Sequence, residues 1–257
     1  MSALHAARVN LCGYNVLITS PEDVKKIITN RIQNREGARV LTLNLEHISR
    51  SQSDKDFHHL TTSADLICAD GMPIVWAGNA LTSRHNKIVR CTGVDLVADM
   101  ITDESTTTYG IIGGVDPQKA LHKLKANPKR LKYLNNGIID ADEDSIEELI
   151  DDLKITNPDV VFIALGVNKA DCIAHHIACV MPHIIIVCVG GSFEFLAGLT
   201  NRAPKWMQVS GLEWLHRLCS EPKRLAKRYI LQYPRGGLAL IKFVVTHMLL
   251  KFCSDVN

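Results

Sequence analysis

Short apolar runs that alternate with segments of helical periodicity are the feature that most constrains the fold of this chain. Residues 66–69 and 159–165 are such runs, and the second carries six consecutive apolar residues after Asp159. Strands that are apolar on both faces are typical of a parallel sheet covered by helices on both sides. Residues 144–153 show the complementary pattern, with apolar residues every three or four positions. The alternation predicts an α/β fold with a Rossmann-like, mostly parallel sheet flanked by helices.

Turn and cap signals divide the chain into further elements. The expected strands cover residues 8–11, 15–18, 38–44, 66–69, 108–112, 131–134, 159–165 and 184–189. One expected helix begins at Ser20 and Pro21. The other expected helices cover residues 56–60, 94–101, 116–125, 144–153 and 170–179. Gly13 and Tyr14 separate the first two strands, which favours a hairpin. Ser20 provides a cap, Pro21 suits the first helical position, and two acids follow in the first turn.

Charge is unevenly distributed along a chain whose formal net charge is only +2. Eight basic residues stand against two acidic ones between positions 202 and 235, whereas residues 140–152 are acidic. From residue 203 onward the pattern is helical, basic and aromatic. We therefore expect a catalytic core over residues 1–201, with the N-terminal hairpin and helix as a subdomain, and a helical appendage over residues 202–257.

The basic and apolar character of the appendage suggests a partner. Basic residues beside an apolar face suit an anionic bilayer surface, and a helix folded back over the core explains the pattern equally well. Nucleic acid is a rival partner that rests on the basic run alone, and we expect none. The longest apolar run, residues 236–253, is interrupted by Lys242, His247 and Lys251, so the sequence predicts no membrane-spanning helix.

The eight cysteines form no Cys-x-x-Cys pair, and most lie in apolar runs. This pattern predicts buried thiols in a reducing compartment rather than disulfides or zinc sites. The first residues carry no charged-then-apolar signal pattern, so we expect a cytoplasmic protein.

Four turns fall at the carboxyl ends of expected strands, where open parallel sheets bind ligands. These turns are residues 44–47, 69–73, 113–117 and 190–194. The glycine pairs Gly113–Gly114 and Gly190–Gly191 would let backbone amides approach a phosphate, although tight turns without a ligand explain them equally well. Asp70 stands between an apolar strand and a glycine. Partial desolvation there can make a carboxylate a base near neutral pH, and a helix N-cap is the alternative.

Metal and dinucleotide sites find little support. Asp140 and Asp142 are spaced like a metal-binding Asp-x-Asp pair, but they lead into a helix, where cap and first-turn charges explain them. The histidine pairs at positions 58–59 and 175–176 lack a third ligand at metal spacing. A Gly-x-Gly-x-x-Gly turn with an acid about twenty residues later is also missing, which argues against a dehydrogenase. We expect neither a metal nor a cofactor.

Read together, these segments resemble the WecG/TagA/CpsF family of bacterial glycosyltransferases over about residues 13–229. The carrying segments are residues 42–44 with Glu46 and His47, residues 69–73, residues 90–95, Gly113 with Gly114, and the most specific stretches, 202–208, 211–218, 221–224 and 227–229. The resemblance implies a Rossmann-like core and an inverting, nucleotide-sugar-dependent transfer. It also implies an acceptor linked to a polyprenyl diphosphate and an appendage that closes over the site and touches the membrane.

The resemblance further implies a UDP-sugar-dependent hexosyltransferase that moves a hexosyl or N-acetylhexosaminyl unit in bacterial exopolysaccharide or cell-surface glycan biosynthesis. Asp70 matches the general base, and Thr42 and Asn44 match polar residues of the same pocket. The enzyme would act without a metal, peripherally at the inner face of the cytoplasmic membrane. A homo-oligomer is compatible with the sequence.

Substrate-binding residues are expected at the remaining motif positions and strand ends. These candidates are Arg90, Gly93, Asp95, Gly113, Gly114, Asp171, Gly190, Gly191, Glu194, Arg217, Arg224 and Arg228. The three arginines of the appendage suit a diphosphate, because guanidinium groups pair bidentately with phosphate oxygens.

Two departures from the family pattern stand at strand ends. The family usually has Pro-x-Gln-Glu where this chain has residues 168–171, so Ala170 lacks the amide and Asp171 is one methylene shorter. Glu194 stands where an aspartate is usual. These departures predict an altered donor or acceptor. A catalytically inactive, nucleotide-sugar-binding scaffold of a polysaccharide assembly complex is the alternative.

Overall fold

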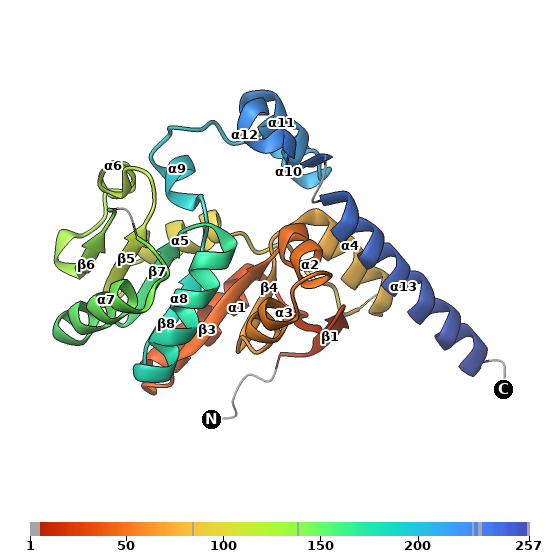
Figure 1. Cartoon of the computed structure of the whole chain (residues 1–257), viewed down its shortest axis with the longest axis horizontal. Helices are drawn as coiled ribbons and strands as arrows, with labels where there is room; N and C mark the ends of the chain where they lie inside the picture. The colour runs from red at the N-terminus through yellow and green to blue at the C-terminus, as the bar shows by residue number, and fades with distance from the viewer. Residues whose placement is uncertain (1–5, 84, 138, 228, 231–232, 256–257) are drawn as a thin grey trace.

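The computed structural model in Figure 1 describes residues 6–83, 85–137, 139–227, 229–230 and 233–255. One sheet of eight strands runs through the core in the order β1-β2-β4-β3-β8-β7-β5-β6. The strands are β1 (Arg8–Leu11), β2 (Tyr14–Leu17), β3 (Ala38–Leu43), β4 (Leu66–Ala69), β5 (Tyr109–Gly113), β6 (Leu131–Asn135), β7 (Val160–Ala164) and β8 (Ile185–Cys188). Only β1 and β2 pair antiparallel among the described strands. The predicted α/β fold is confirmed.

Burial explains why the strands are so apolar. Every residue of β3, β4, β5 and β7 is buried, as expected for strands covered by helices on both faces. The N-terminal hairpin continues the same sheet, because Val16 of β2 pairs in parallel with Ile67 of β4. The segment that we expected to form a subdomain is therefore one edge of the core sheet.

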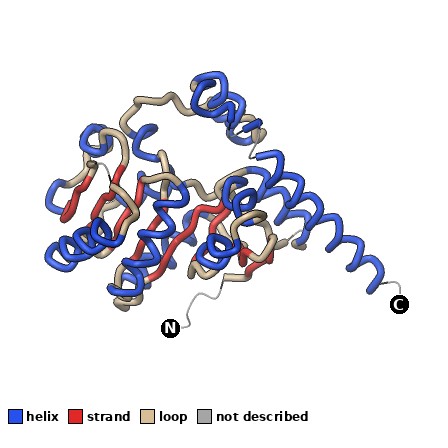
Figure 2. The backbone as a smooth tube through the Cα atoms, viewed as in Figure 1, coloured by secondary structure: helices blue, strands red, loops and turns tan. Residues whose placement is uncertain are grey.

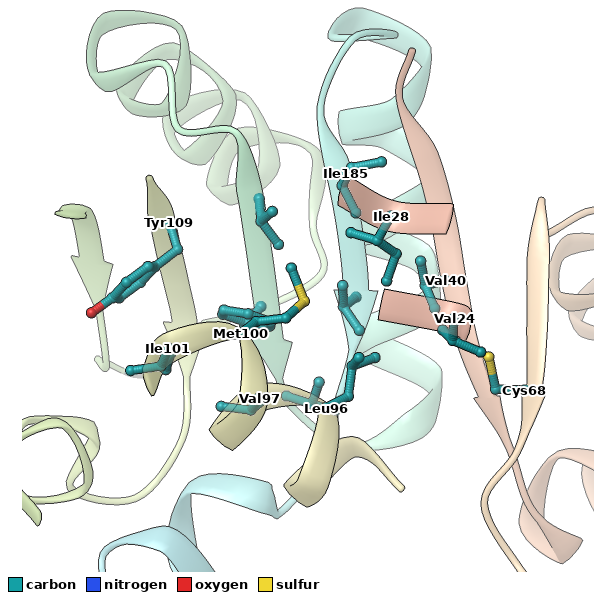
Figure 3. Close-up of a cluster of buried hydrophobic side chains, with 14 of the residues drawn as sticks. Val24, Ile28, Val40, Cys68, Leu96, Val97, Met100, Ile101, Tyr109 and Ile185 are labelled. Carbon is teal, nitrogen blue, oxygen red and sulfur yellow. The ribbon is translucent and has the colours of Figure 1, made fainter. Parts of the chain in front are cut away.

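Helices cover both faces of this sheet. They are α1 (Pro21–Gln33), α2 (Leu45–Ser51), α3 (Lys55–Thr62), α4 (Met72–Leu81), α5 (Gly93–Thr102), α6 (Pro117–Lys123), α7 (Glu143–Thr156), α8 (Val167–Val180) and α9 (Ser192–Leu196). On one face, α1 and α5 pack on the central strands. Figure 3 shows Val24 and Ile28 of α1 and Leu96 of α5 directed toward Val40 and Ile185 of the sheet. On the other face, α7 and α8 form a second apolar cluster.

One helix of the core has no apolar stripe and was missed. The segment Leu45–Ser51 carries mostly polar residues, yet it forms α2. Asn44 begins this helix by accepting a hydrogen bond from the amide of Glu46 at 2.9 Å, and the side chain of His47 completes a capping box. A capping box of this kind stabilises a short helix end without any help from apolar periodicity. The helix lies directly after β3, at the edge of the sheet where ligands bind.

The appendage is helical, as expected, and contains α10 (Lys205–Val209), α11 (Glu213–Ser220), α12 (Pro222–Lys227) and α13 (Tyr233–Asp255). Figure 2 shows only helices and loops after the last strand, and α13 as the long helix that extends away from the sheet. The first half of α13 packs against α2 and α4, with Leu240 in their apolar cluster. Gly236 lies so close to α2 that a Cβ atom there would come within 2.6 Å of the Leu45 carbonyl oxygen.

The sequence predicted no membrane-spanning helix, and by length and composition alone the described residues contain one candidate. Tyr233–Cys253 is apolar enough and long enough to cross a bilayer, and only 11% of its apolar window is buried inside the chain. Lys242 and Lys251 interrupt the apolar run less than their charge suggests, because long basic side chains can extend their charged ends toward water. Length and composition alone are weak support for a spanning helix.

The cysteines follow the prediction only in part. All eight thiols are free. Among them Cys68 and Cys91 are buried, whereas Cys179, Cys219 and Cys253 are exposed on helices. Apolar neighbours in the sequence did not ensure burial, because a helix places successive residues on different faces.

Candidate active site

A pocket of about 500 Å³ opens at the carboxyl ends of β3, β4, β7 and β8 and is bordered by the appendage. The pocket lies next to the boundary between β3 and β8, where strands from the two halves of the chain meet. Thr42 bridges this boundary by donating its hydroxyl to the carbonyl of Cys188 at 3.0 Å. Crevices at this place in open α/β sheets are the usual ligand sites.

Asp70 lies on the wall of this pocket, directly after β4. Its amide donates to the Leu43 carbonyl at 2.9 Å, which continues the β3–β4 ladder and fixes the backbone. Gly71, not Asp70, is the N-cap of α4, so the alternative of a helix cap is wrong. The side chain is 28% exposed, and the exposed part faces the pocket. A carboxylate in this position is free to meet a ligand.

The surroundings of Asp70 make its carboxyl group a stronger base than usual. Burial raises the pKa of Asp70 to about 6. The carboxylate of Glu213 adds to this rise, whereas the positive charges of Arg90 and Arg217 oppose it. Above about pH 6 the group is therefore ionised and able to accept a proton.

Arg90 holds the backbone at Asp70 and contacts the appendage. Its Nε donates to the carbonyl of Asp70 at 2.7 Å, and its Nη2 lies 3.8 Å from Oδ1 of the same residue. Its Nη1 lies 2.7 Å from Oε2 of Glu213 on α11. Arg90 thus joins the pocket wall to the helix that borders it.

A buried histidine, His47, lines the pocket in contact with the predicted Asp171, and sequence reasoning missed this contact. The Nε2 atom of His47 lies 3.5 Å from Oδ2 of Asp171 on α8, and these side chains are 4% and 6% exposed. The Nδ1 atom of His47 accepts from the amide of Asn44 at 3.3 Å. Asp171 was expected to bind substrate, but its partner 124 positions earlier left no signal in the sequence. The pair fixes α2 and Asn44 against α8.

Several helices begin at the pocket, and among them α8 leaves the backbone amides of its first turn unpaired, whereas α4 leaves only that of Met72, because Pro73 has no N–H and Ile74 donates to the Gly71 carbonyl. Gly71 and Gly166 are the N-caps of α4 and α8, and neither helix has a side-chain cap. The first turn of α5, with Gly93 at its start, also lines the pocket and is capped by Thr92. Uncapped helix N-termini combine unpaired N–H groups with the positive end of the helix dipole, which suits a phosphate.

Other expected site residues divide into two groups. Gly190, Gly191 and Glu194 line the pocket together with those already described. Gly113, Gly114 and Asp95 are not among its lining residues. Gly113 ends β5 and Gly114 follows it, and β7 separates β5 from β8 in the sheet. The two glycines have positive φ angles of 77° and 87°, so a tight turn explains them.

Asp95 is already occupied by a partner from the appendage. Arg202 donates to both of its carboxylate oxygens, with Nη2 at 2.8 Å from Oδ2, and Thr92 donates to the same oxygen at 2.6 Å. Burial would raise the pKa of Asp95, but the bonds from Arg202 and Thr92 outweigh it and lower this pKa. Its role in the structure is to attach the start of the appendage to α5.

The appendage supplies cationic and aromatic lining. Arg217 places its guanidinium 5.1 Å from the ring centre of Phe195 and forms no ion pair within the described residues. The aromatic side chains of Trp214, Tyr229 and Tyr233 line the pocket. The ring of Tyr229 contacts those of both Trp214 and Tyr233. Of the remaining predicted arginines, Arg228 and the side chain of Arg224 lie outside the described residues.

Comparison with known proteins gives a consistent picture. The sequence model of the glycosyl transferase WecG/TagA/CpsF family matches residues 9–247. The chain is similar to the N-acetylglucosaminyldiphosphoundecaprenol N-acetyl-beta-D-mannosaminyltransferase of Bacillus subtilis strain 168, with 25% identity over 216 residues and 82% of each chain covered. It is also similar to the protein of the same description from Bacillus spizizenii strain W23, with 26% identity over 226 residues, which cover 85% of this chain and 84% of the relative.

Proposed function

Because the chain belongs to the glycosyl transferase WecG/TagA/CpsF family, we propose that it moves a hexosyl or N-acetylhexosaminyl unit from a UDP-sugar to a polyprenyl-diphosphate-linked saccharide. The observation that carries this proposal is the position of Asp70. Its carboxylate stands in a pocket at the strand ends, beside helix N-termini that suit a diphosphate. Base and phosphate site therefore share one pocket.

The proposed reaction is a single displacement. Asp70 takes the proton from an acceptor hydroxyl, and the hydroxyl oxygen attacks the anomeric carbon of the donor. The bond from that carbon to the diphosphate breaks, and UDP leaves with the electron pair. The configuration inverts because the oxygen enters opposite to the leaving group. A base whose pKa lies near 6 suits this step, because it is ionised at neutral pH and still basic enough to accept the proton.

Charge on the leaving diphosphate needs a partner in the pocket. The N-terminus of α8 contributes backbone N–H groups, that of α4 contributes the Met72 amide, and Arg217 contributes a guanidinium that forms no ion pair within the described residues. Fixed donors directed at a developing negative charge are usually among the largest contributions to catalysis. We propose that these three groups, with Arg224 and Arg228, hold the donor diphosphate or the lipid diphosphate.

The names of the relatives suggest the substrates. Both describe transfer of an N-acetylmannosaminyl unit to N-acetylglucosaminyldiphosphoundecaprenol. We propose an acceptor of this lipid-linked class for the present chain. The sugar is a separate matter, because Ala170 and Glu194 line the pocket at positions where the family usually has an amide and an aspartate. Loss of an amide removes hydrogen bonds that a sugar substituent could use, so we propose an altered donor or acceptor.

We propose that α13 holds the enzyme on the cytoplasmic membrane surface. This helix is apolar and exposed at Ile241 in its first half and at Leu249 and Leu250 in its outer half, and Lys242 and Lys251 stand beside these residues. Such a combination suits an anionic lipid interface. Replacing Ile241 and Leu249 by glutamate should move the protein from the membrane fraction to the supernatant, with the melting temperature unchanged. Unaltered membrane recovery of a folded variant would count against this part of the proposal.

The central experiment is an assay of purified protein with N-acetylglucosaminyldiphosphoundecaprenol and a panel of UDP-sugars, with products analysed by mass. We expect one donor to give a product heavier by one sugar unit. The rival function, an inactive scaffold that binds nucleotide sugars, predicts donor binding without transfer. Tight binding of a UDP-sugar with no product from any donor would favour that rival.

A further inference from the structure

Arg90 lies between two carboxylates, and the distances to them differ. Its guanidinium is 2.7 Å from Glu213 of α11 but 3.8 Å from the carboxylate of Asp70, whose backbone carbonyl it binds through Nε. Glu213 is only 15% exposed and has a second cation, Arg202, at 4.0 Å. The guanidinium is thus directed toward the appendage rather than toward the base.

We propose that Glu213 is a positioning residue that holds the guanidinium of Arg90 away from the Asp70 carboxylate and thereby keeps the base strong when α11 covers the pocket. This inference rests on the proposed role of Asp70 as general base. It adds that the base depends on a residue of the appendage that need not touch the substrate.

Electrostatics supports this geometry. The charged groups that act on Asp70 are Arg90 from the segment before α5, Arg202 from the segment before α10, Glu213 and Arg217 from α11, and His47 from α2. Among these, only Glu213 raises the pKa of Asp70, and it does so in addition to binding Arg90. Removing the Glu213 charge should weaken the base in two ways, because the repulsion is lost and Arg90 becomes free to approach Asp70.

The position of Glu213 has a further consequence for the reaction. If α11 moves away from the pocket, Glu213 leaves with it, and Arg90 remains with Asp70 as its nearest carboxylate. Arg217 would leave as well and oppose this change, but water that enters the open pocket removes the burial that raises the pKa of Asp70 most, so the base is weakest when the pocket is open. Such an arrangement favours transfer to the bound acceptor over hydrolysis of the donor, because activation of a hydroxyl requires the covered pocket.

The test is the pH dependence of kcat/KM for transfer in Glu213→Gln. We expect the acid limb, which reports ionisation of the base, to move to lower pH by about one unit, and the plateau rate to fall by about fivefold because a weaker base accepts the proton less well. Glu213→Asp, which keeps the charge, should restore most of the limb. Asp140→Asn is the matched control, since it breaks a 2.7 Å ion pair with Lys169 outside the pocket.

A second variant acts in the opposite direction. Arg90→Gln removes the cation that lowers the pKa of Asp70, so its acid limb should move to higher pH. This variant also keeps the proposal testable if Glu213→Gln fails to fold. An acid limb that stays at the wild-type position in folded Glu213→Gln, or that moves downward in Arg90→Gln, would overturn the proposal. An acid limb unaffected by loss of the Asp70 carboxylate would instead contradict the proposed base itself.

Discussion

The two sides of the pocket are built in different ways. The floor comes from strand ends and their helices, where Thr42, His47 and Asp171 are buried and hold one another or the backbone. The roof comes from α11, where Trp214 is 45% exposed and Glu213 is held by ion pairs. Breaking a contact between buried polar groups costs much free energy, so burial fixes their geometry. Partly exposed ion pairs are weaker and form and break reversibly. We conclude that the floor supplies a fixed geometry and the roof supplies charge.

Loss of the base should give the largest effect on activity. Asp70→Asn keeps the shape of the side chain but cannot accept a proton, so transfer should fall by roughly a thousandfold. The rate would be measured with saturating donor and acceptor, and Asp140→Asn would serve as the control carboxylate at the surface. Near wild-type turnover of a folded Asp70→Asn protein would exclude Asp70 as the general base.

Loss of charge from the roof should rank second. Arg217→Ala removes a cation that forms no ion pair within the described residues, and kcat/KM for the donor should fall about a hundredfold. Arg217→Lys should recover only part of this loss, because an ammonium group cannot pair bidentately. Lys154→Ala, far from the pocket, should leave the rate unchanged. Equal rates for wild type and a folded Arg217→Ala would mean that the roof does not bind the diphosphate.

The floor should be more sensitive in stability than the roof. His47→Ala takes one partner from the buried carboxylate of Asp171, which keeps its hydrogen bond with Cys188, and leaves a cavity, so the free energy of unfolding should fall by about 3 kcal/mol. For a chain of this length the melting temperature should fall by about 9 °C. His176→Ala, an exposed histidine on α8, is the control and should change it by about 1 °C. A similar loss in Glu213→Gln would remove the contrast between floor and roof.

The smallest predicted effect is the loss of folding stability that comes from burying the ionised carboxylate of Asp70. The pKa of Asp70 is raised to about 6 in the folded chain, above its unfolded value of about 3.9, so the folded state binds the proton more tightly. Ionisation of Asp70 therefore destabilises the fold as the pH rises from 4 to 6, and this cost is complete above about pH 6. Asp70→Asn should melt about 8 °C higher than wild type at pH 8 and equally at pH 4. A melting curve of Asp70→Asn that matches wild type at both pH values would contradict this burial cost.

Sequence patterns predicted the elements well wherever local signals were strong. The strand 66–69 and the helix 94–101 appear as β4 and α5 with ends within one residue, because apolar runs and a Thr92 cap define them locally. Polar α2 was missed because its stability comes from a capping box and tertiary packing. The alternation of elements also gave the class of fold, since parallel strands require crossover helices.

The candidate site could be predicted only where it follows from position along the chain. Asp70 and Gly190 were placed at strand ends and do line the pocket. Gly113 was placed there by the same rule, but it ends β5, and the order of strands in the sheet cannot be read from one sequence. The His47–Asp171 and Arg90–Glu213 contacts join residues more than a hundred positions apart, so no local pattern announces them.

The close approach of α13 to α2 at Gly236 fixes the distance between these two helices. Because a side chain there would collide with the Leu45 carbonyl, α13 and α2 are joined backbone to backbone at one height. The same α2 carries Asn44 and His47 at the pocket. The distance between the apolar face of α13 and the pocket is therefore fixed. This distance would set the height of the pocket above the membrane, where the diphosphate of a lipid-linked acceptor would lie at the level of the headgroups. A larger residue at position 236 would change that height without replacing any residue of the pocket.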